Sequence, residues 1–103
     1  MVRADVISLI TENASAHGVH EAITEDAREI PAEIRSVTRS EFYTALNAGT
    51  QPEYIFHLAL EDDYQDERFL RFRGRKYRII RAYLTNDGGI DLTAERSDVN
   101  GTD

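Results

Sequence analysis

The chain has 103 residues, of which 41% are hydrophobic and 30% are charged, and its net charge is −7. This length and composition fit one soluble globular domain and leave no room for a second. Without cysteine the chain can form neither a disulfide framework nor a thiolate metal site, which agrees with folding in a reducing cytoplasm. No segment approaches the roughly 18 consecutive apolar residues of a spanning helix, so we expect neither a membrane segment nor a signal peptide. We place one domain at residues 1–96 and a flexible tail at residues 97–103.

Three segments lead to the middle of the chain. Asp5–Thr11 is rich in β-branched and aliphatic residues and predicts a first strand. Residues 12–27 are polar and lack a strand period, so we expect a long exposed connection there. Residues 28–37 alternate apolar and charged side chains and predict a strand with one buried face. Pro31 lacks a backbone N–H, which favours a bulge or a place at the border of the sheet.

Residues 37–49 (VTRSEFYTALNAG) carry the signals of a short helix. Thr38 suits the N-cap, and Glu41 suits the third helical position of a capping box. Val37 and Phe42 stand at the two places of a hydrophobic staple, in which an apolar residue before the N-cap meets one in the first turns. The start of this helix is therefore strongly specified.

The end of the helix and its apolar side are marked as well. Gly49 suits the left-handed residue after a helix, and Pro52 prevents the helix from resuming. Phe42, Ala45 and Leu46 form an apolar stripe at helical spacing. About ten helical residues fall short of the roughly 12 to 15 at which an isolated helix is marginally stable in water. We expect the helix to pack either on its own domain, as an ordinary crossover helix, or on another chain.

The second half of the chain predicts strands joined by tight turns. Residues 53–61 predict the main core strand, with one face formed by Tyr54, Phe56, Leu58 and Leu60. Residues 68–85 predict two strands that turn at Arg73-Gly74, because glycine adopts a positive φ without steric cost. The stretch TNDGG predicts another turn, and residues 89–95 return as a strand with Ile90, Leu92 and Ala94 on its buried face.

These elements predict a mainly β fold. Five or six short strands with mostly tight connections, and one short α-helix in a long inter-strand connection, indicate a small antiparallel β-barrel, because closure shields the strand edges. An open α+β sheet with the helix packed on one face is the competing architecture.

The basic residues are concentrated in one hairpin. Residues 68–81 hold seven of the twelve basic residues and no acid, which leaves five basic and nineteen acidic residues, a charge of −14, for the rest of the chain. This asymmetry predicts a patch for nucleic acid or for an acidic protein partner. Alternatively, the arginines pair with acidic neighbours such as EDDYQDE at residues 61–67. The candidate partner-binding residues are Arg71, Arg73, Arg75, Lys76 and Arg78.

Catalytic and metal-binding patterns are weak. His17, His20 and Glu21 cluster in a loop but lack a third ligand at a recognisable spacing. His57 lies in the main core strand and is expected to be a structural histidine with satisfied partners. The EDDYQDE stretch lacks the glycine and the spacing of a calcium loop and is typical of a solvated turn. With no nucleophile elbow and no glycine-rich phosphate loop, we expect no enzyme, no metal and no cofactor.

A small nucleic-acid-binding barrel is the alternative function. In that interpretation Phe69, Phe72 and Tyr77 interleave with the basic residues as a stacking and phosphate-binding strip. Strand alternation weakens it, because Phe69 shares a face with Arg71, whereas Phe72 falls on the opposite face and is better explained as core.

Three stretches occur in order from about Asp5 to Glu95: RADVISLITE, then VTRSEFYTALNAGTQPEYIF, then FRGRKYRIIRAYLTNDGGIDLTAE. Together they resemble the small head–tail connector proteins of long-tailed bacteriophages, the head-closure or stopper group, a family without a catalytic signature. The resemblance implies a β-barrel that forms a ring below the portal and adaptor proteins and lines the DNA exit channel. It also implies a protein that helps to retain packaged DNA without reading its sequence, offers its other side to the tail proteins, and resides in the virion neck after synthesis in the host cytoplasm.

In that family a long connection between the second and third strands reaches toward the channel axis, and by chain order it matches Ser36–Glu53 here. The residues so implied to face the channel or a neighbouring subunit are Thr38, Glu41, Phe42, Tyr43, Leu46, Gly49 and Pro52. One departure is that capping this complete predicts a preformed helix, which argues against gating by a disorder-to-order change. An acidic body would repel phosphates and let DNA slide, so the basic hairpin would face a protein partner.

Overall fold

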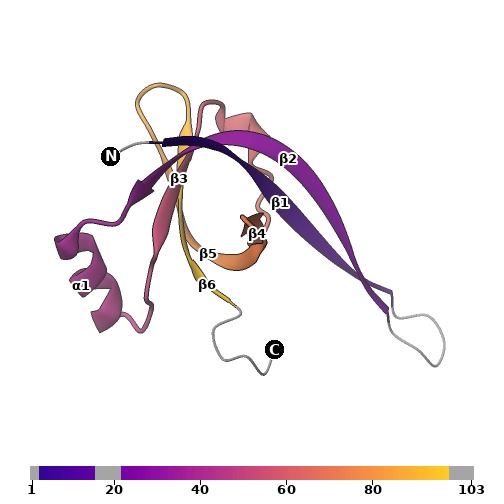
Figure 1. Ribbon diagram of the computed structural model, residues 1–103, viewed down its shortest axis with the longest axis horizontal. Helices are drawn as coiled ribbons and strands as arrows, with labels where there is room; N and C mark the ends of the chain where they lie inside the picture. The colour runs from indigo at the N-terminus through magenta and orange to yellow at the C-terminus, as the bar shows by residue number, and fades with distance from the viewer. Residues whose placement is uncertain (1–2, 16–21, 98–103) are drawn as a thin grey trace.

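A computed structural model describes residues 3–15 and 22–97 of the chain. In these residues six strands close into an antiparallel barrel in the order β1-β2-β3-β6-β5-β4, and one α-helix lies outside it (Figure 1). The predicted small antiparallel barrel with one short helix is confirmed, and the competing open sheet is wrong. The elements are β1 (Arg3–Ser15), β2 (Ala22–Ser36), α1 (Arg39–Asn47), β3 (Tyr54–Leu58), the 3-10 helix η1 (Glu61–Asp63), β4 (Phe69–Phe72), β5 (Arg75–Leu84) and β6 (Ile90–Arg96).

The hydrophobic core fills the inside of the barrel and draws on all six strands. Strand alternation turns every second side chain inward, and the predicted inward faces of β2 and β6 are confirmed. Four aromatic rings form a cluster inside, with centroids 5.3 to 6.4 Å apart: Tyr54, Phe56, Phe72 and Tyr77. The remaining buried residues of the core are Ile7, Leu9, Ile30, Ala32, Ile34, Leu58, Leu70, Ile90, Leu92 and Ala94.

The first two strands are much longer than the sequence predicts. They pair from Arg3↔Ile34 to Ser15↔Ala22, so the long connection predicted at residues 12–27 is wrong for the described residues 12–15 and 22–27. The outer half of this pair extends as a two-stranded ribbon beyond the barrel (Figure 1), because β4 pairs with β1 only at residues 8–10. A ribbon that leaves the core needs no period-2 apolar pattern, so the usual strand signal is missing there. The histidine cluster at residues 17–21 lies outside the described residues.

Pro31 sits where β2 has a neighbour on one side. It faces Val6 of β1, whereas the pairing of β2 with β3 begins only at Glu33. The prediction that this strand borders the sheet is wrong, since β2 lies between β1 and β3 in a closed barrel. Pro31, which has no backbone N–H to donate, nevertheless lies on the stretch of β2 that is not paired with β3. The reason for the prediction, that proline avoids a strand paired on both sides, therefore holds at this position.

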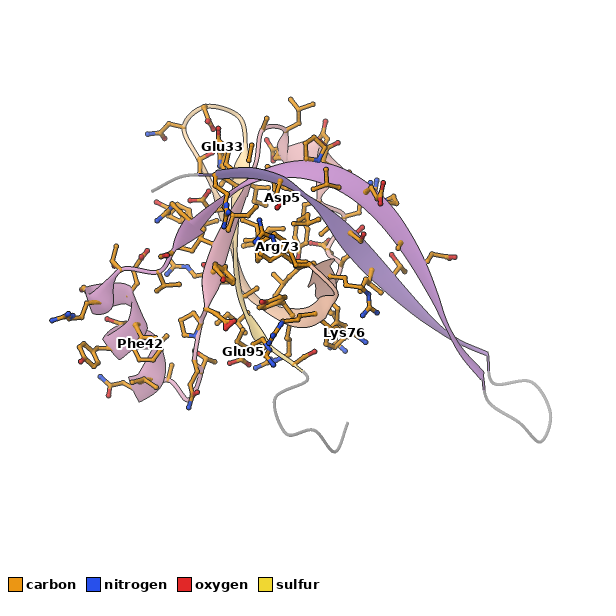
Figure 2. The ribbon with its side chains drawn as sticks, in the orientation of Figure 1. Asp5, Glu33, Phe42, Arg73, Lys76 and Glu95 are labelled. Carbon is orange, nitrogen blue, oxygen red and sulfur yellow. The ribbon has the colours of Figure 1, made fainter. Side chains whose placement is uncertain are left out.

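The predicted hairpin between β4 and β5 is confirmed. Arg73 and Gly74 form its turn with φ values of +52° and +78°, and two left-handed residues are the signature of the turn that matches the twist of paired strands. The Arg73 guanidinium then reaches across to β1, where its Nη2 lies 3.1 Å from Oδ2 of Asp5 (Figure 2).

The main core strand ends earlier than predicted. β3 stops at Leu58, and Leu60 is 63% exposed instead of joining the core. The chain leaves the sheet here to enter η1, where the backbone N–H of Glu61 donates to the carbonyl of Gly88 in the β5–β6 turn. Gly89 of the same turn passes so close to β3 that an added Cβ would lie 2.3 Å from the Leu58 carbonyl oxygen. The β3 terminus and the β5–β6 turn therefore form one tightly joined end of the barrel.

The last strand, β6, ends at Arg96. Ser97, which the sequence places in the tail, still donates through its N–H and hydroxyl to the carbonyl of Lys76. Residues 98–103, the rest of the predicted tail, lie outside the described residues.

Candidate functional site

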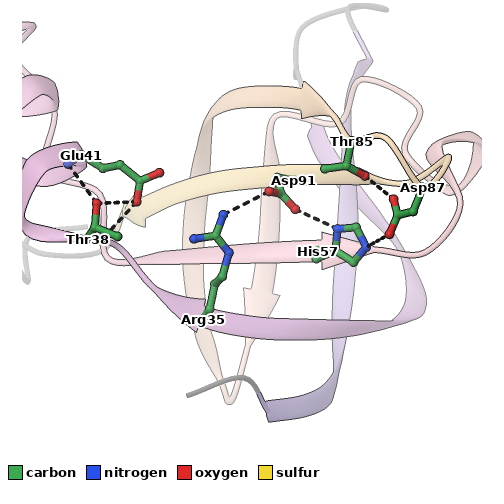
Figure 3. Close-up of polar contacts among 7 residues, drawn as sticks. All are labelled: Arg35, Thr38, Glu41, His57, Thr85, Asp87 and Asp91. Atoms are coloured by element: carbon green, nitrogen blue, oxygen red, sulfur yellow. Dashed lines mark hydrogen bonds and ion pairs between the residues drawn. The ribbon is translucent and has the colours of Figure 1, made fainter.

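The start of α1 is built as the sequence predicts. The Thr38 hydroxyl accepts from the N–H of Glu41 at 3.2 Å, and the Glu41 carboxylate accepts from the N–H of Thr38 at 2.9 Å (Figure 3). This reciprocal pair is the capping box. The hydrogen bond from the Thr38 backbone holds the pKa of the Glu41 carboxyl below its ordinary value of 4.5. Val37 and Phe42 are both half-buried and line one surface hollow with Pro52.

The end of α1 is fixed by a second backbone motif. Gly49 has a φ of +87° and donates to the carbonyl of Leu46, while Thr50 donates to the carbonyl of Ala45. This pair of bonds is the Schellman arrangement and satisfies carbonyls that a helix end leaves open. The chain is then tied to β6, since Gln51 donates to the Glu95 carboxylate and Glu53 to the Ala94 carbonyl. The helix is therefore held at both ends.

The body of α1 is far less packed than its ends. None of its residues is buried, and Tyr43 and Leu46 are 58% and 38% exposed. The predicted apolar stripe is thus only partly covered, with Phe42 and Ala45 half-buried and Leu46 at the surface. Between α1 and the outside of the barrel lies a groove of about 450 Å³. Its apolar lining includes Ala45, Ala48, Pro52, Ile55 and Ile80.

The basic hairpin presents its charges outward, as alternation predicts. Leu70, Phe72 and Tyr77 point into the core, whereas Arg71 and Lys76 lie opposite each other on the outer face. Like charges directly across a strand pair are unfavourable unless other groups compensate them. Lys76 lies 4.5 Å from the centre of the Phe69 ring. Arg73 pairs with Asp5 and Arg78 with Glu95, and the remaining candidate, Arg75, is exposed at the turn.

One acidic neighbour of the hairpin, Glu67, has a different partner from the predicted one. Within EDDYQDE, the buried Glu67 pairs with Arg28 of β2 at 2.5 Å, and Arg28 also donates to the carbonyl of Asp63. Burial acts to raise the pKa of Glu67, but the hydrogen bonds from Arg28 and from the N–H of Gln65 outweigh it and hold the pKa below 4.5. The ion pair therefore anchors the β3–β4 connection to β2, and the Glu67 carboxylate is directed to Arg28 and not to the hairpin.

A polar cluster on the opposite side of the barrel surrounds His57. Its Nδ1 lies 2.8 Å from Asp91 Oδ1, and its Nε2 lies 3.2 Å from Asp87 Oδ2 (Figure 3). Arg35 pairs with the second Asp91 oxygen at 3.2 Å. Hydrogen bonds from the Thr85 hydroxyl and the Gly89 N–H lower the pKa of Asp87. The prediction of a structural histidine with satisfied partners is confirmed, although the ring lies on the outer face of β3.

The acidic residues beside this cluster were not predicted from the sequence. Glu29 and Glu33 project from the outer face of β2 and are exposed. The signal was present, because both alternate with the buried residues of that strand. Only the strand order of the barrel brings Glu33 into one surface hollow with His57, Asp87 and Asp91.

Among the side chains that the structure describes, those of residues 3–11 and 26–97, no group of three His, Asp or Glu is arranged to hold a metal ion. No helix in the described part of the chain is long and apolar enough to cross a membrane. No protein-family model matches the sequence, and no curated protein matches it significantly.

Proposed function

We propose that this chain is a structural protein of the bacteriophage neck, a head–tail connector of the head-closure type, and that it performs no catalysis. It assembles as a ring under the portal and adaptor, helps to retain packaged DNA, and provides a docking surface for the tail. What supports this proposal is the sequence resemblance together with a barrel that completes its own core and yet carries an under-packed helix.

The under-packed helix is the observation that carries the proposal. α1 has nine residues and is capped at both ends, but no residue of it is buried. A helix this short depends on packing for most of its stability, and its caps supply only about 1 kcal/mol each. The exposed Tyr43 and Leu46 are the side chains that a neighbouring subunit would cover.

The charge distribution agrees with a conduit for DNA. With residues 68–81 set aside, the chain carries a charge of −14, and carboxylates repel phosphates. A wall rich in lysine and arginine would instead bind DNA through release of counterions and resist its movement. The basic hairpin accordingly faces an acidic protein surface and not the channel.

Hydrogen exchange on the isolated chain and on the assembled neck tests the role of α1. We expect residues 39–47 to exchange markedly more slowly after assembly, because contacts with a neighbour suppress local opening. Amides of β3, which pair on both sides within the barrel, serve as the internal control and should change little. Equal protection of α1 in both states would contradict the proposed role.

Particle assembly tests the proposal as a whole. Particles that lack this chain should leak DNA or fail to accept tails. Replacing Tyr43 and Leu46 with serine should reproduce that defect without unfolding the barrel, since both side chains are exposed. Asn47→Ser, on the same exposed helix, is the matched control and should assemble normally. Full infectivity of the double variant would count against the interface.

Binding of single-stranded nucleic acid is the second candidate, favoured by the outward row of Arg71, Lys76 and Arg78. Its weakness is that Phe72 and Tyr77 are buried, which leaves Phe69 as the one outward aromatic ring of the predicted strip. This function predicts binding that weakens steeply with salt. The absence of any oligonucleotide shift at low salt would remove it.

A further inference from the structure

The last part of β5 is a strand edge with a neighbour on one side only. β4 pairs with β5 at residues 75–78, and a bulge between Ile79 and Arg81 follows. Residues 81–84, which we call the β5 edge, pair with β6 on one side and, among the described strands, with none on the other. Backbone N–H and C=O groups along such an edge are a template for another strand.

The side chains of the β5 edge are exposed and mostly apolar. All four residues are exposed, and Tyr83 and Leu84 are each 57% exposed. Proteins usually protect an open edge with charged side chains, proline or a bulge. Here the bulge precedes the edge, and residues 82–84 contain neither a charge nor a proline. The edge is therefore suited to pairing with a further strand.

Arg81 gives this edge a positive charge. Its guanidinium lies 5.3 Å from the centre of the Tyr83 ring, a contact that uses the face of the cation and not its N–H groups. Glu41 lines the same groove as Arg81, but its carboxylate accepts from the N–H and the hydroxyl of Thr38. A strand that brings acidic residues would therefore suit the β5 edge.

The outer part of the β1–β2 ribbon lacks a third strand. Residues 11–15 and 22–26, which we call the outer ribbon, pair with each other and with no other described strand. A two-stranded ribbon is marginally stable at best in water, and a third strand stabilises it. The outer ribbon contains Glu12, Glu25 and Asp26 and no basic residue, and its register places Glu12 directly opposite Glu25, an unfavourable pairing of like charges. Figure 1 shows the ribbon projecting from the barrel, where another molecule can reach it.

We propose that the outer ribbon of one copy adds to the β5 edge of the next copy, with Arg81 beside the acidic residues of the ribbon. This inference rests on the proposed function, for which it names the contact between ring subunits. The β5 edge supplies the third strand and the cation that the ribbon lacks, and the ribbon covers Tyr83 and Leu84. Because two different surfaces of the chain meet, the contact is heterologous, the kind that closes into rings.

Cross-linking tests which segments meet, because the chain contains no cysteine. Thr24→Cys places a thiol in the outer ribbon, and Ala82→Cys places one in the β5 edge. A short bis-maleimide should convert the purified double variant into a ladder of covalent multimers, since each copy joins two neighbours. Thr24→Cys with Leu60→Cys is the matched control, because Leu60 is exposed but lies outside the strands, and it should give no ladder.

Charge reversal tests the contribution of Arg81. Arg81→Glu should weaken association of the purified chain roughly tenfold or more, because like charges then meet. Arg75→Glu, at an exposed position of the β4–β5 turn, changes the net charge equally, from −7 to −9, and is the matched control. Arg81→Lys should retain most of the association. Sedimentation velocity measures the association, and circular dichroism establishes that each variant is folded.

Two results would overturn the contact. One is a double-cysteine variant that gives no longer a ladder than its control, and the other is an Arg81→Glu variant that associates as well as Arg75→Glu. Either result leaves the neck assignment to the particle experiment. Conversely, a ladder together with normal tail attachment in particles that lack the chain would keep the contact and remove the neck assignment.

Discussion

At the scale of single residues, the end of the barrel around His57 is closely packed. Both ring nitrogens face carboxylates, and a neutral imidazole has only one N–H to donate. Gly89 closes the same cluster, because a Cβ there would lie 2.8 Å from Cε1 of His57 as well as against the β3 backbone. The position is therefore closed to every side chain for steric reasons.

Substitution of Gly89 tests this close approach. Gly89→Ala should lower the free energy of unfolding by about 1–3 kcal/mol, the usual cost of overpacking, because the β5–β6 turn must move away from β3. Gly88→Ala is the matched control, since Gly88 has a φ of +85° but nothing within 4 Å of an added Cβ. It should cost about 1 kcal/mol from backbone strain alone. Denaturant unfolding measures both variants, and a smaller loss at Gly89 than at Gly88 would contradict the steric explanation.

The buried carboxylate of Glu67 predicts a dependence of stability on acid. Its pKa is lower in the folded chain than its ordinary value of 4.5, so its contribution is complete above that pH and is lost as the pH falls through the folded pKa. Glu67→Gln should therefore cost about 1–3 kcal/mol of unfolding free energy at pH 7, because Arg28 loses its charged partner.

That difference from the natural chain should shrink below about pH 4.5. Urea unfolding at a series of pH values measures it. Asp62→Asn, at an exposed position of η1, is the control and should change little at any pH. A gap that remains constant down to strongly acidic solution would be incompatible with the ion pair between Arg28 and Glu67.

At the scale of elements, features that depend on adjacent residues were predicted correctly, whereas features that depend on contacts between distant segments were not. The caps of α1 and the Arg73-Gly74 turn were predictable because each depends on a few adjacent residues. The length of β1 and β2 was not, since a ribbon outside the core has no buried face to impose a pattern. The place of Leu60 was missed for a related reason, because alternation continues in the sequence after the strand has ended at Leu58.

The N-cap of α1 predicts a local effect. Thr38→Ala removes the hydroxyl that accepts from Glu41, a loss of about 1 kcal/mol in helix stability. Because no residue of α1 is buried, the loss should appear as faster exchange of amides 39–47 with little change in global unfolding. Thr38→Ser keeps the hydroxyl, and Ser40→Ala changes an exposed residue of the same first turn that is not the cap, so both should leave exchange nearly unchanged. Cooperative destabilisation of the whole barrel by Thr38→Ala would show that α1 is more firmly integrated than its exposure indicates.

At the scale of the whole molecule, the closed barrel brings together charged residues that are far apart in the sequence. The sequence revealed the basic segment at residues 68–81 but not the acidic cluster, because Glu33, Asp87 and Asp91 are far apart along the chain. A cluster of residues that only the strand order brings together cannot be recognised from the sequence before that order is known. The proposed inter-subunit residues of α1 were identified through the family resemblance, and the structure adds that they sit on a helix held at its ends and open along its body.

The location of Ile55 restricts how α1 can serve an assembly. This side chain is on the outside of β3 and yet only 2% exposed, lying in the groove beside Ala45 and Pro52. Moving α1 away from the barrel would expose the Ile55 side chain to water, which costs about 1.5–3 kcal/mol for an isoleucine. A partner that binds α1 must either leave the helix packed over Ile55 or cover this side chain itself. Binding to the helix in its present position therefore costs less free energy than displacing it.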